Sequence, residues 1–156
     1  MGDANADTVL HVPRSRATRG TLGDASGAGT AVDAVPVRMR TLRDLLDGCE
    51  FPAVDLVKVD IEGYEARLFA SVDVETIRRC EAIVFEFSEP NLAQCGSSRA
   101  DLEAVPWMGE FEVWAMDDLS GRLTAVSGLS AVRGPEATVV LHRREGGRKL
   151  DLSAGL

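Results

Sequence analysis

Four charged residues surround a single glycine inside an otherwise apolar stretch of the sequence. The stretch VDLVKVDIEGYEARLF contains Lys58, Asp60, Glu62 and Glu65 around Gly63. A carboxylate can accept the proton of a hydroxyl group, and a neighbouring lysine can stabilise negative charge. The pattern therefore indicates proton transfer or the binding of a polar ligand.

A structural explanation of these charges stays open beside the functional one. Carboxylates are favourable near a helix N-terminus, so Glu62 and Glu65 could complement the following helix, and Lys58 could pair with an acidic neighbour. However, Lys58 and Asp60 share one face of a strand that we expect to be buried on both faces. Glu86 interrupts a second apolar strand in the same way, and buried carboxylates are costly unless they are paired. Two carboxylates in equivalent places favour a functional site.

Two apolar strands position these charges, and helices connect them. The composition predicts strands over residues 54–61 and 82–87, because both are apolar and rich in β-branched or aromatic residues. It predicts a helix over 63–70 and a second helix over 74–80, which Asp73 would cap. A nearly continuous apolar strand is typical of a parallel sheet covered on both faces.

The remaining segments complete an α/β pattern. Further strands are predicted at 8–12, 35–39, 110–116 and 137–143, helices at 41–48 and 97–105, and a hairpin turn at 117–123. Alternating helices and strands predict a doubly wound, mainly parallel sheet, to which the closing hairpin adds an antiparallel strand at the edge. Ligands of such sheets bind beyond the carboxyl ends of the strands, where Asp60 and Glu86 are expected.

The chain divides into one folded domain and two flanking segments. Residues 1–34 are expected to be flexible or hairpin-like, because 13–34 are rich in Gly, Ala, Ser and Thr without sustained periodicity. Residues 35–143 form the α/β domain, and the polar, glycine-rich residues 144–156 are expected to form a mobile tail.

Composition narrows the class of protein. A net charge of −8 argues against nucleic acid or an anionic membrane as the main partner. No apolar run approaches the length of a membrane helix, and the N-terminal residues lack a signal-peptide pattern. Cys49, Cys80 and Cys95 are predicted to be reduced thiols that mostly fill core space in a cytoplasmic protein. His11 and His142 are too few and too far apart in sequence for a histidine-rich metal centre.

Three segments carry a resemblance to a known family. TLRDLLDG, VDLVKVDIEGYEARLF and AIVFEF resemble the FkbM-type methyltransferases, whose motif Lys-Ile-Asp-Val-Glu-Gly-x-Glu differs here only by aliphatic exchanges. The resemblance covers roughly residues 35–143. It implies a Rossmann-like methyltransferase that uses S-adenosylmethionine to methylate a hydroxyl oxygen of a sugar or small metabolite.

The resemblance also implies roles for individual residues. Asp60 would accept the hydroxyl proton or lie near the methyl group, Glu62 would contact substrate or support Asp60, and Lys58 would stabilise charge. Asp60 and Gly63 are the expected cofactor contacts. The acceptor pocket would be lined by Glu86, Ser88 and Asn91. A divalent cation on Asp60, Glu86 and Asn91 is an alternative that no spacing requires, so no metal is predicted.

The chain departs from the family at the glycine-rich cofactor turn. The only upstream candidates are Gly20, Gly23, Gly27 and Gly29, and no clear strand precedes them or helix follows them. The sequence therefore predicts the C-terminal part of a methyltransferase, with the sheet incomplete on its N-terminal side. The alternative is a non-catalytic remnant that acts as a binding or oligomerising module. An unpaired sheet edge beside residues 54–61 would then favour self-association.

Overall fold

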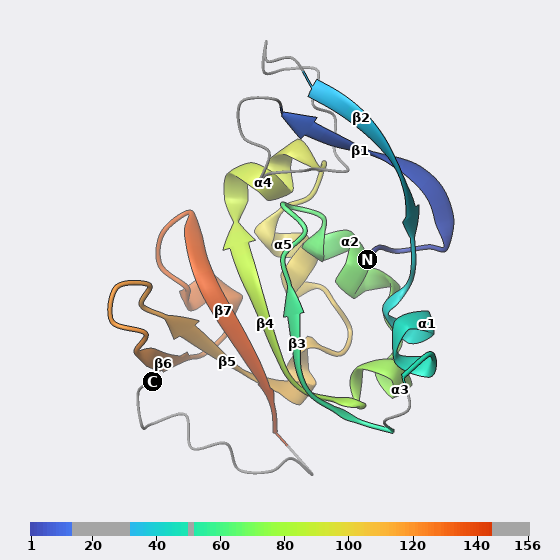
Figure 1. Ribbon diagram of the computed structural model, residues 1–156. Helices are drawn as coiled ribbons and strands as arrows, with labels where there is room; N and C mark the ends of the chain where they lie inside the picture. The colour runs from blue at the N-terminus through green and yellow to red at the C-terminus, as the bar shows by residue number, and fades with distance from the viewer. Residues whose placement is uncertain (14–31, 50–51, 145–156) are drawn as a thin grey trace.

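The strands of the protein form two separate β-sheets (Figure 1). The computed structural model describes residues 1–13, 32–49 and 52–144. A two-stranded antiparallel sheet has the order β1-β2, and a five-stranded sheet has the order β3-β4-β7-β5-β6. The strands are β1 (Ala6–Pro13), β2 (Val32–Met39), β3 (Val54–Val59), β4 (Cys80–Ser88), β5 (Phe111–Met116), β6 (Leu123–Val126) and β7 (Glu136–Arg143).

Short helices connect the strands of the larger sheet. In Figure 1, α2 and α5 lie behind the sheet, whereas α4 continues from the upper end of β4. The helices are α1 (Leu42–Asp47), α2 (Glu65–Ser71), α3 (Val74–Ile77), α4 (Glu89–Gln94) and α5 (Arg99–Glu103), with single turns η2 (Met108–Glu110) and η3 (Leu129–Ala131). The predicted helices and strands are all present, with bounds that differ by a few residues. Helix α4 was not predicted.

The direction of the strands differs from the expectation for the larger sheet. Only β3 and β4 pair in parallel, and the other three pairs are antiparallel, so the protein has a mixed α/β sheet and a mainly parallel sheet is not confirmed. An antiparallel hairpin lies at the edge of the sheet, as predicted, and it consists of β5 and β6. Strand β6 was not among the predicted strands, and the predicted last strand, β7, lies between β4 and β5 and hydrogen-bonds to both.

One face of the larger sheet packs against the helices. Side chains such as Val59, Phe85 and Leu141 point to that face and are at most 1% exposed. The ring of Trp107 stacks edge-on against neighbouring aromatic rings, and its Nε1 donates a hydrogen bond to the carbonyl oxygen of Phe69 at 3.1 Å. A buried indole with its N–H satisfied adds apolar burial without a desolvation cost. Trp107 is thus a core residue.

Strand β3 is not buried on both faces. Asp55 and Lys58 are exposed, and the side chain of Leu56 is 56% exposed. The expectation of burial failed because β3 has a hydrogen-bonded neighbour on one side only, and the helices cover one face. In contrast, β4 lies between two strands and is largely buried, except at the exposed Glu86 and the partly buried Glu81 and Val84.

The two-stranded sheet is attached to the start of helix α2. The hydroxyl group of Tyr64 donates a hydrogen bond to Asp3 at 2.9 Å, and its ring packs with Met39, Cys95 and the half-buried Ile61. Tyr64 is 8% exposed and belongs to the core.

The segment 13–34, in which the sequence shows no sustained periodicity, is part of a strand at both ends, because Pro13 belongs to β1 and residues 32–34 belong to β2.

Several predictions concern residues outside the described part of the chain. The glycine-rich segment with Gly20, Gly23, Gly27 and Gly29 lies there, as do residues 145–156 of the predicted tail. The division into 1–34, 35–143 and 144–156 stays a prediction.

Helix α1 begins at a side-chain cap. The hydroxyl oxygen of Thr41 accepts a hydrogen bond from the backbone N–H of Asp44 at 3.2 Å, and the helix ends at Gly48. The reciprocal half of a capping box is replaced, since the N–H of Thr41 donates to Asn5. The N-terminal segment is therefore attached to α1 by the groups that cap it.

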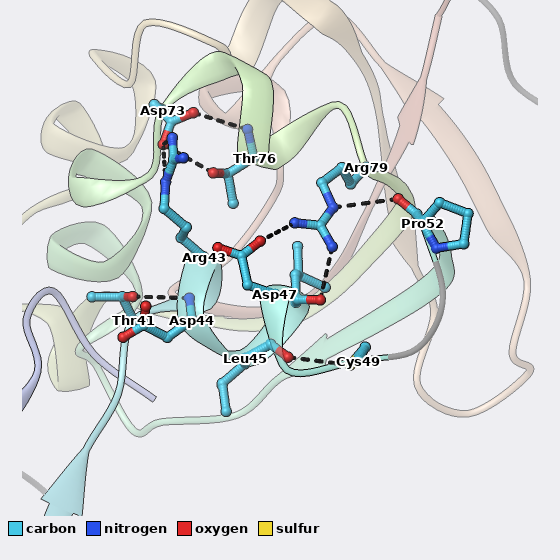
Figure 2. A network of polar contacts seen from close by, with 11 residues as sticks. Thr41, Arg43, Asp44, Leu45, Asp47, Cys49, Pro52, Asp73, Thr76 and Arg79 are labelled. Atoms are coloured by element: carbon cyan, nitrogen blue, oxygen red, sulfur yellow. Dashed lines mark hydrogen bonds and ion pairs between the residues drawn. The ribbon is translucent and has the colours of Figure 1, made fainter.

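Arginines join α1 to α3 and β4 (Figure 2). Arg43 donates from Nε and Nη2 to Asp73 at 3.2 and 2.5 Å, and Asp73 also caps α3 by accepting from the N–H of Thr76 at 2.9 Å. Arg79 donates to Asp47 at 2.5 Å and to the carbonyl oxygen of Leu46 at 2.7 Å. One carboxylate thus both starts α3 and holds α1 against it.

The three cysteines are free thiols. Cys80 and Cys95 are buried, as expected, whereas Cys49 is exposed. Burial raises the pKa of the Cys80 thiol to about 11. Within the described ranges, no helix is long and apolar enough to cross a membrane.

Replacing Asp73 tests the junction of α1 and α3. We expect Asp73→Ala to lower the free energy of unfolding by about 1 kcal/mol, since the α3 cap is lost together with the Arg43 contact. The hydrogen bond from Arg43, followed by that from Thr76, holds the pKa of Asp73 well below its ordinary value. This stabilisation is present above about pH 4 and is lost as the pH falls towards the folded-state pKa.

Urea unfolding at pH 7 and pH 3 measures both effects. Asp73→Ala should lose more stability at pH 7 than at pH 3. The control is Glu75→Gln, which changes an exposed carboxylate on the same helix. Equal losses at the two pH values would contradict the role given to the ionised Asp73.

Candidate functional site

Two of the predicted site residues, Asp60 and Glu86, lie near the carboxyl ends of neighbouring strands. Val59 of β3 is the register partner of Phe85 of β4 in the parallel pair. Asp60 and Glu86 directly follow these partners, so both carboxylates lie at the carboxyl ends of β3 and β4 and on the same face. That face is the one opposite the helix-packed side chains of Val59 and Phe85. The sequence therefore placed these two carboxylates together correctly.

Lys58 and Asp60 form an ion pair on that face. Lys58 Nζ lies 2.5 Å from Asp60 Oδ2, and the side chains are 67% and 47% exposed. Solvent screens such a pair, so it adds little to stability. The argument that buried carboxylates need a functional explanation does not hold here, because Asp60 and Glu86 are both exposed. Because the Lys58–Asp60 pair is exposed, a ligand from solvent can reach Asp60.

The turn between β3 and α2 has an unusual backbone that one carboxylate holds in place. Glu62 has φ of 53° and Gly63 has φ of 99°, both in the left-handed region. Glu65, only 2% exposed, accepts hydrogen bonds from the N–H groups of Ile61 at 3.1 Å and Gly63 at 2.9 Å. A non-glycine residue in this region is strained, so surrounding contacts must hold Glu62 there.

The environment of Glu65 is set by two opposing effects. Burial raises the pKa of its carboxyl group, and the backbone N–H groups of Ile61 and Gly63 act in the opposite direction. A buried carboxylate is tolerated when such donors satisfy it. The motif's last glutamate therefore closes the turn, in agreement with the structural role predicted for it.

Helix α4 packs directly on this turn. Asn91 Nδ2 donates a hydrogen bond to Glu62 Oε2 at 2.9 Å, and Cys95 Sγ lies 3.7 Å from the carbonyl oxygen of Glu62. A Cβ on Gly63 would lie 2.2 Å from the carbonyl oxygen of Asn91. Contact with α4 is therefore sufficient to require glycine at this position. The cofactor contact predicted for Gly63 stays a prediction.

Ser88 has a structural function at the start of α4. Its hydroxyl oxygen accepts a hydrogen bond from the N–H of Asn91 at 3.4 Å, and the hydroxyl group donates to Glu136 Oε1 at 3.3 Å. The residue is 3% exposed. The predicted site residues thus fall into three groups. Asp60 and Glu86 lie at the same exposed edge, and Glu62 and Asn91 contact each other. Ser88 caps the helix that contains Asn91.

A groove opens at the same edge of the sheet, on the far side of β7. Its volume is about 640 Å³. Small apolar side chains line part of it, and acidic side chains with one arginine line the rest. The lining residues are Ala115, Met116, Asp117, Asp118, Thr124, Val126, Ala131, Val132, Arg133, Glu136 and Ala137. Glu136 links the groove to Ser88 and hence to α4.

Sequence reasoning missed α4, Cys95 and Glu136 as parts of this region. A signal for α4 was present, because Ser88 precedes Glu89 and Pro90, and a capping serine with proline in the first turn is a helix start. No local signal indicated Glu136, whose position depends on strand order. No group of three or more histidine, cysteine, aspartate or glutamate side chains suited to a metal ion occurs in the described ranges.

Comparison with known proteins decides the family. The family model described as the methyltransferase FkbM domain matches residues 2–114. The chain belongs to the FkbM methyltransferase family. This match includes β3, the turn, α2, β4 and α4, so the family's shared segment contains the carboxyl edge described above. No curated protein and no solved structure matches the chain significantly.

Substituting Gly63 tests the packing of the turn. We expect Gly63→Ala to destabilise the protein strongly. The backbone at this position has a positive φ that alanine rarely adopts, and the new methyl group would collide with the backbone of Asn91. Gly121 is the matched control: its φ is also positive, at 68°, but nothing lies within 4 Å of a Cβ there. Gly121→Ala should therefore cost only the backbone strain, about 1 kcal/mol.

Thermal unfolding compares the two variants directly. The loss for Gly63→Ala should exceed that for Gly121→Ala by about 2 kcal/mol or more, as expected for an overpacked site. Equal losses would show that α4 does not press on the turn.

Proposed function

We propose that the protein is an S-adenosylmethionine-dependent methyltransferase domain that methylates a hydroxyl oxygen of a sugar or small metabolite. Membership of the FkbM family supports methyl transfer. One observation supports the location of the site: Asp60 and Glu86 lie on the same face at the carboxyl edge of the parallel pair β3–β4. We further propose that this pair belongs to a Rossmann-like sheet in a cytoplasmic protein.

The charge of the carboxyl edge suits the proposed methyl donor. S-adenosylmethionine carries a positive sulfonium centre and an ammonium group, and Asp60, Glu62 and Glu86 supply carboxylates there. Asp60 is the residue we expect to lie nearest the donor. When bound, S-adenosylmethionine supplies an electrophilic methyl group.

The residues around the motif would prepare the acceptor hydroxyl. Asp60 would accept its proton, because it is exposed and stands at the strand end. Lys58 would fix the orientation of Asp60 through their 2.5 Å contact and balance its charge. Glu62 would contact the acceptor from a carboxylate held by Asn91. Positioning of this kind supplies much of the acceleration in group transfer.

The acceptor would extend from Asp60 along the carboxyl edge towards the groove beside β7. Glu86 would contact the acceptor near its reacting hydroxyl group, while Ser88 and Asn91 would form the wall between the two regions. The groove volume of about 640 Å³ lies in the range that small-molecule sites occupy. Its mixture of small apolar and carboxylate side chains suits a hydroxylated ring.

Replacing Asp60 tests the proposal. We expect isothermal titration calorimetry to show saturable binding of S-adenosylmethionine to the protein. Asp60→Asn should weaken this binding and abolish methyl transfer to responsive acceptors in a panel of sugars, as detected by mass spectrometry. The fold should be retained, because Asp60 is about half exposed and its one ion pair is on the surface.

Asp55→Asn is the matched control, since Asp55 is an exposed aspartate of the same strand. It should bind and react as the unchanged protein does. An absence of heat at millimolar cofactor would exclude activity of this chain by itself. Equal effects of the two substitutions would contradict the role of Asp60.

A second candidate function is that of a binding or oligomerising module without catalysis. The observation in its favour is the edge of β3, which has no hydrogen-bonded strand beyond it among the described residues. Leu56 on this strand is 56% exposed, and unprotected edge strands pair with other chains. We propose that a second copy of the chain pairs with β3.

Leu56→Lys tests this pairing. A charge on the edge strand should shift the chain from dimer to monomer in sedimentation equilibrium. The control is Leu119→Lys, because Leu119 is fully exposed in the β5–β6 turn. A monomeric unchanged protein, or a dimer that survives Leu56→Lys, would contradict pairing through β3.

A further inference from the structure

Three arginines line a hollow at the opposite edge of the sheet. Arg78, Arg143 and Arg144 surround it together with Gly109 and Glu110, and its volume is about 380 Å³. They come from the end of α3, the end of β7 and the residue after it, while Gly109 and Glu110 belong to η2. Three cations around one hollow are unexpected in a chain with a net charge of −8.

Each arginine is held in place by a defined contact. Arg78 donates from Nε and Nη2 to the two carboxylate oxygens of Glu110, at 2.8 and 2.7 Å. Arg143 donates to Glu81 at 3.0 Å, and Arg144 Nε donates to the carbonyl oxygen of Phe111 at 3.0 Å. Because contacts fix the side chains in advance, little conformational entropy remains to be lost when a ligand binds.

The hollow retains hydrogen-bond donors and positive charge. A guanidinium group has five N–H donors, and the contacts above use one of Arg143 and one of Arg144. Arg143 Nε is buried without a hydrogen-bond partner. In the contacts described above, Arg78 and Arg143 pair with carboxylates, whereas the side chain of Arg144 donates to a backbone carbonyl group. Arg144 therefore brings a positive charge that no carboxylate in these contacts neutralises.

We propose that this arginine-lined hollow binds the phosphate group of a phosphorylated small molecule. A phosphate presents acceptor oxygens in several directions, which suits guanidinium groups arriving from three parts of the chain better than a planar carboxylate does. The volume exceeds that of a phosphate group alone, so the hollow also holds part of the molecule that carries it. Arg143 contacts Glu81, and Glu86 lies five residues further along β4, so this site lies roughly 17 Å along the strand from Glu86.

The site is independent of the proposed methyl transfer. Its residues lie at the amino end of β4 and the carboxyl end of β7, whereas the methyl-transfer residues lie at the other end of β4. A failure of one proposal therefore leaves the other untouched, and binding alone tests this one.

Calorimetric titration of the full chain with glucose 6-phosphate and with inorganic phosphate, in chloride buffer at constant ionic strength, is the experiment. We expect saturable binding of both, with glucose 6-phosphate the tighter. Arg144→Gln should weaken binding about tenfold, the effect of losing one charge-assisted hydrogen-bond donor. Its fold should persist, because Arg144 is exposed, its side chain donates to a backbone carbonyl group, and the substitution leaves its backbone hydrogen bond to Glu110 in place.

Two controls separate a defined site from general charge. Arg38→Gln removes the same charge from an exposed arginine of β2, in the smaller sheet, and should leave the dissociation constant within about twofold. Gly109→Glu places a competing carboxylate in the hollow and should abolish binding, whereas Gly109→Gln should retain more of it. Both changes are sterically allowed, because nothing lies within 4 Å of a Cβ at Gly109.

Three results would overturn the proposal. The first is an absence of binding at millimolar phosphate ester. The second is an equal loss in Arg38→Gln and Arg144→Gln, which would indicate unspecific attraction. The third is equal affinity for glucose 6-phosphate and inorganic phosphate, which would exclude a phosphorylated molecule as the preferred ligand.

Discussion

The turn at the carboxyl end of β3 depends on a single buried carboxylate. Glu65 accepts hydrogen bonds from two backbone N–H groups of the turn that precedes it, and this contact joins β3 to α2. Helix α4, which follows the neighbouring strand, packs against the same turn. Two crossovers of the chain therefore meet at one strained turn, which directly follows Asp60 and contains Glu62. Glu86 takes its position from β4, which pairs with β3 and β7.

The charged motif thus has two parts with different physical functions. Gly63 and Glu65 satisfy packing and backbone hydrogen bonding, which is why they are buried. Lys58 and Asp60 lie in solvent and contribute little to the fold, so stability does not explain their presence. Glu62 belongs to both parts, because its backbone is strained and its side chain contacts Asn91. Strain of this kind is often found beside functional sites.

The sequence predicted what local interactions determine. Thr41, Asp73 and Ser98 precede their helices and cap them, and each signal depends on residues at most a few positions apart. Strand order was not accessible, because the position of β7 between β4 and β5 depends on contacts between distant segments. The exposure of β3 was misjudged for the same reason: an apolar strand has the same composition at an edge as in the centre of a sheet. The burial of Glu65 had no signal, because a glutamate in the first turn of a helix is usually solvated.

We propose that the methyl donor binds where β3 and β4 end. A titration with S-adenosylhomocysteine, followed by the backbone amide resonances of isotope-labelled protein, tests it most directly. We expect the largest changes in amide chemical shift at residues 60–64 and 86–91. Saturating changes confined to other parts of the chain, such as the opposite edge of the sheet, would contradict it.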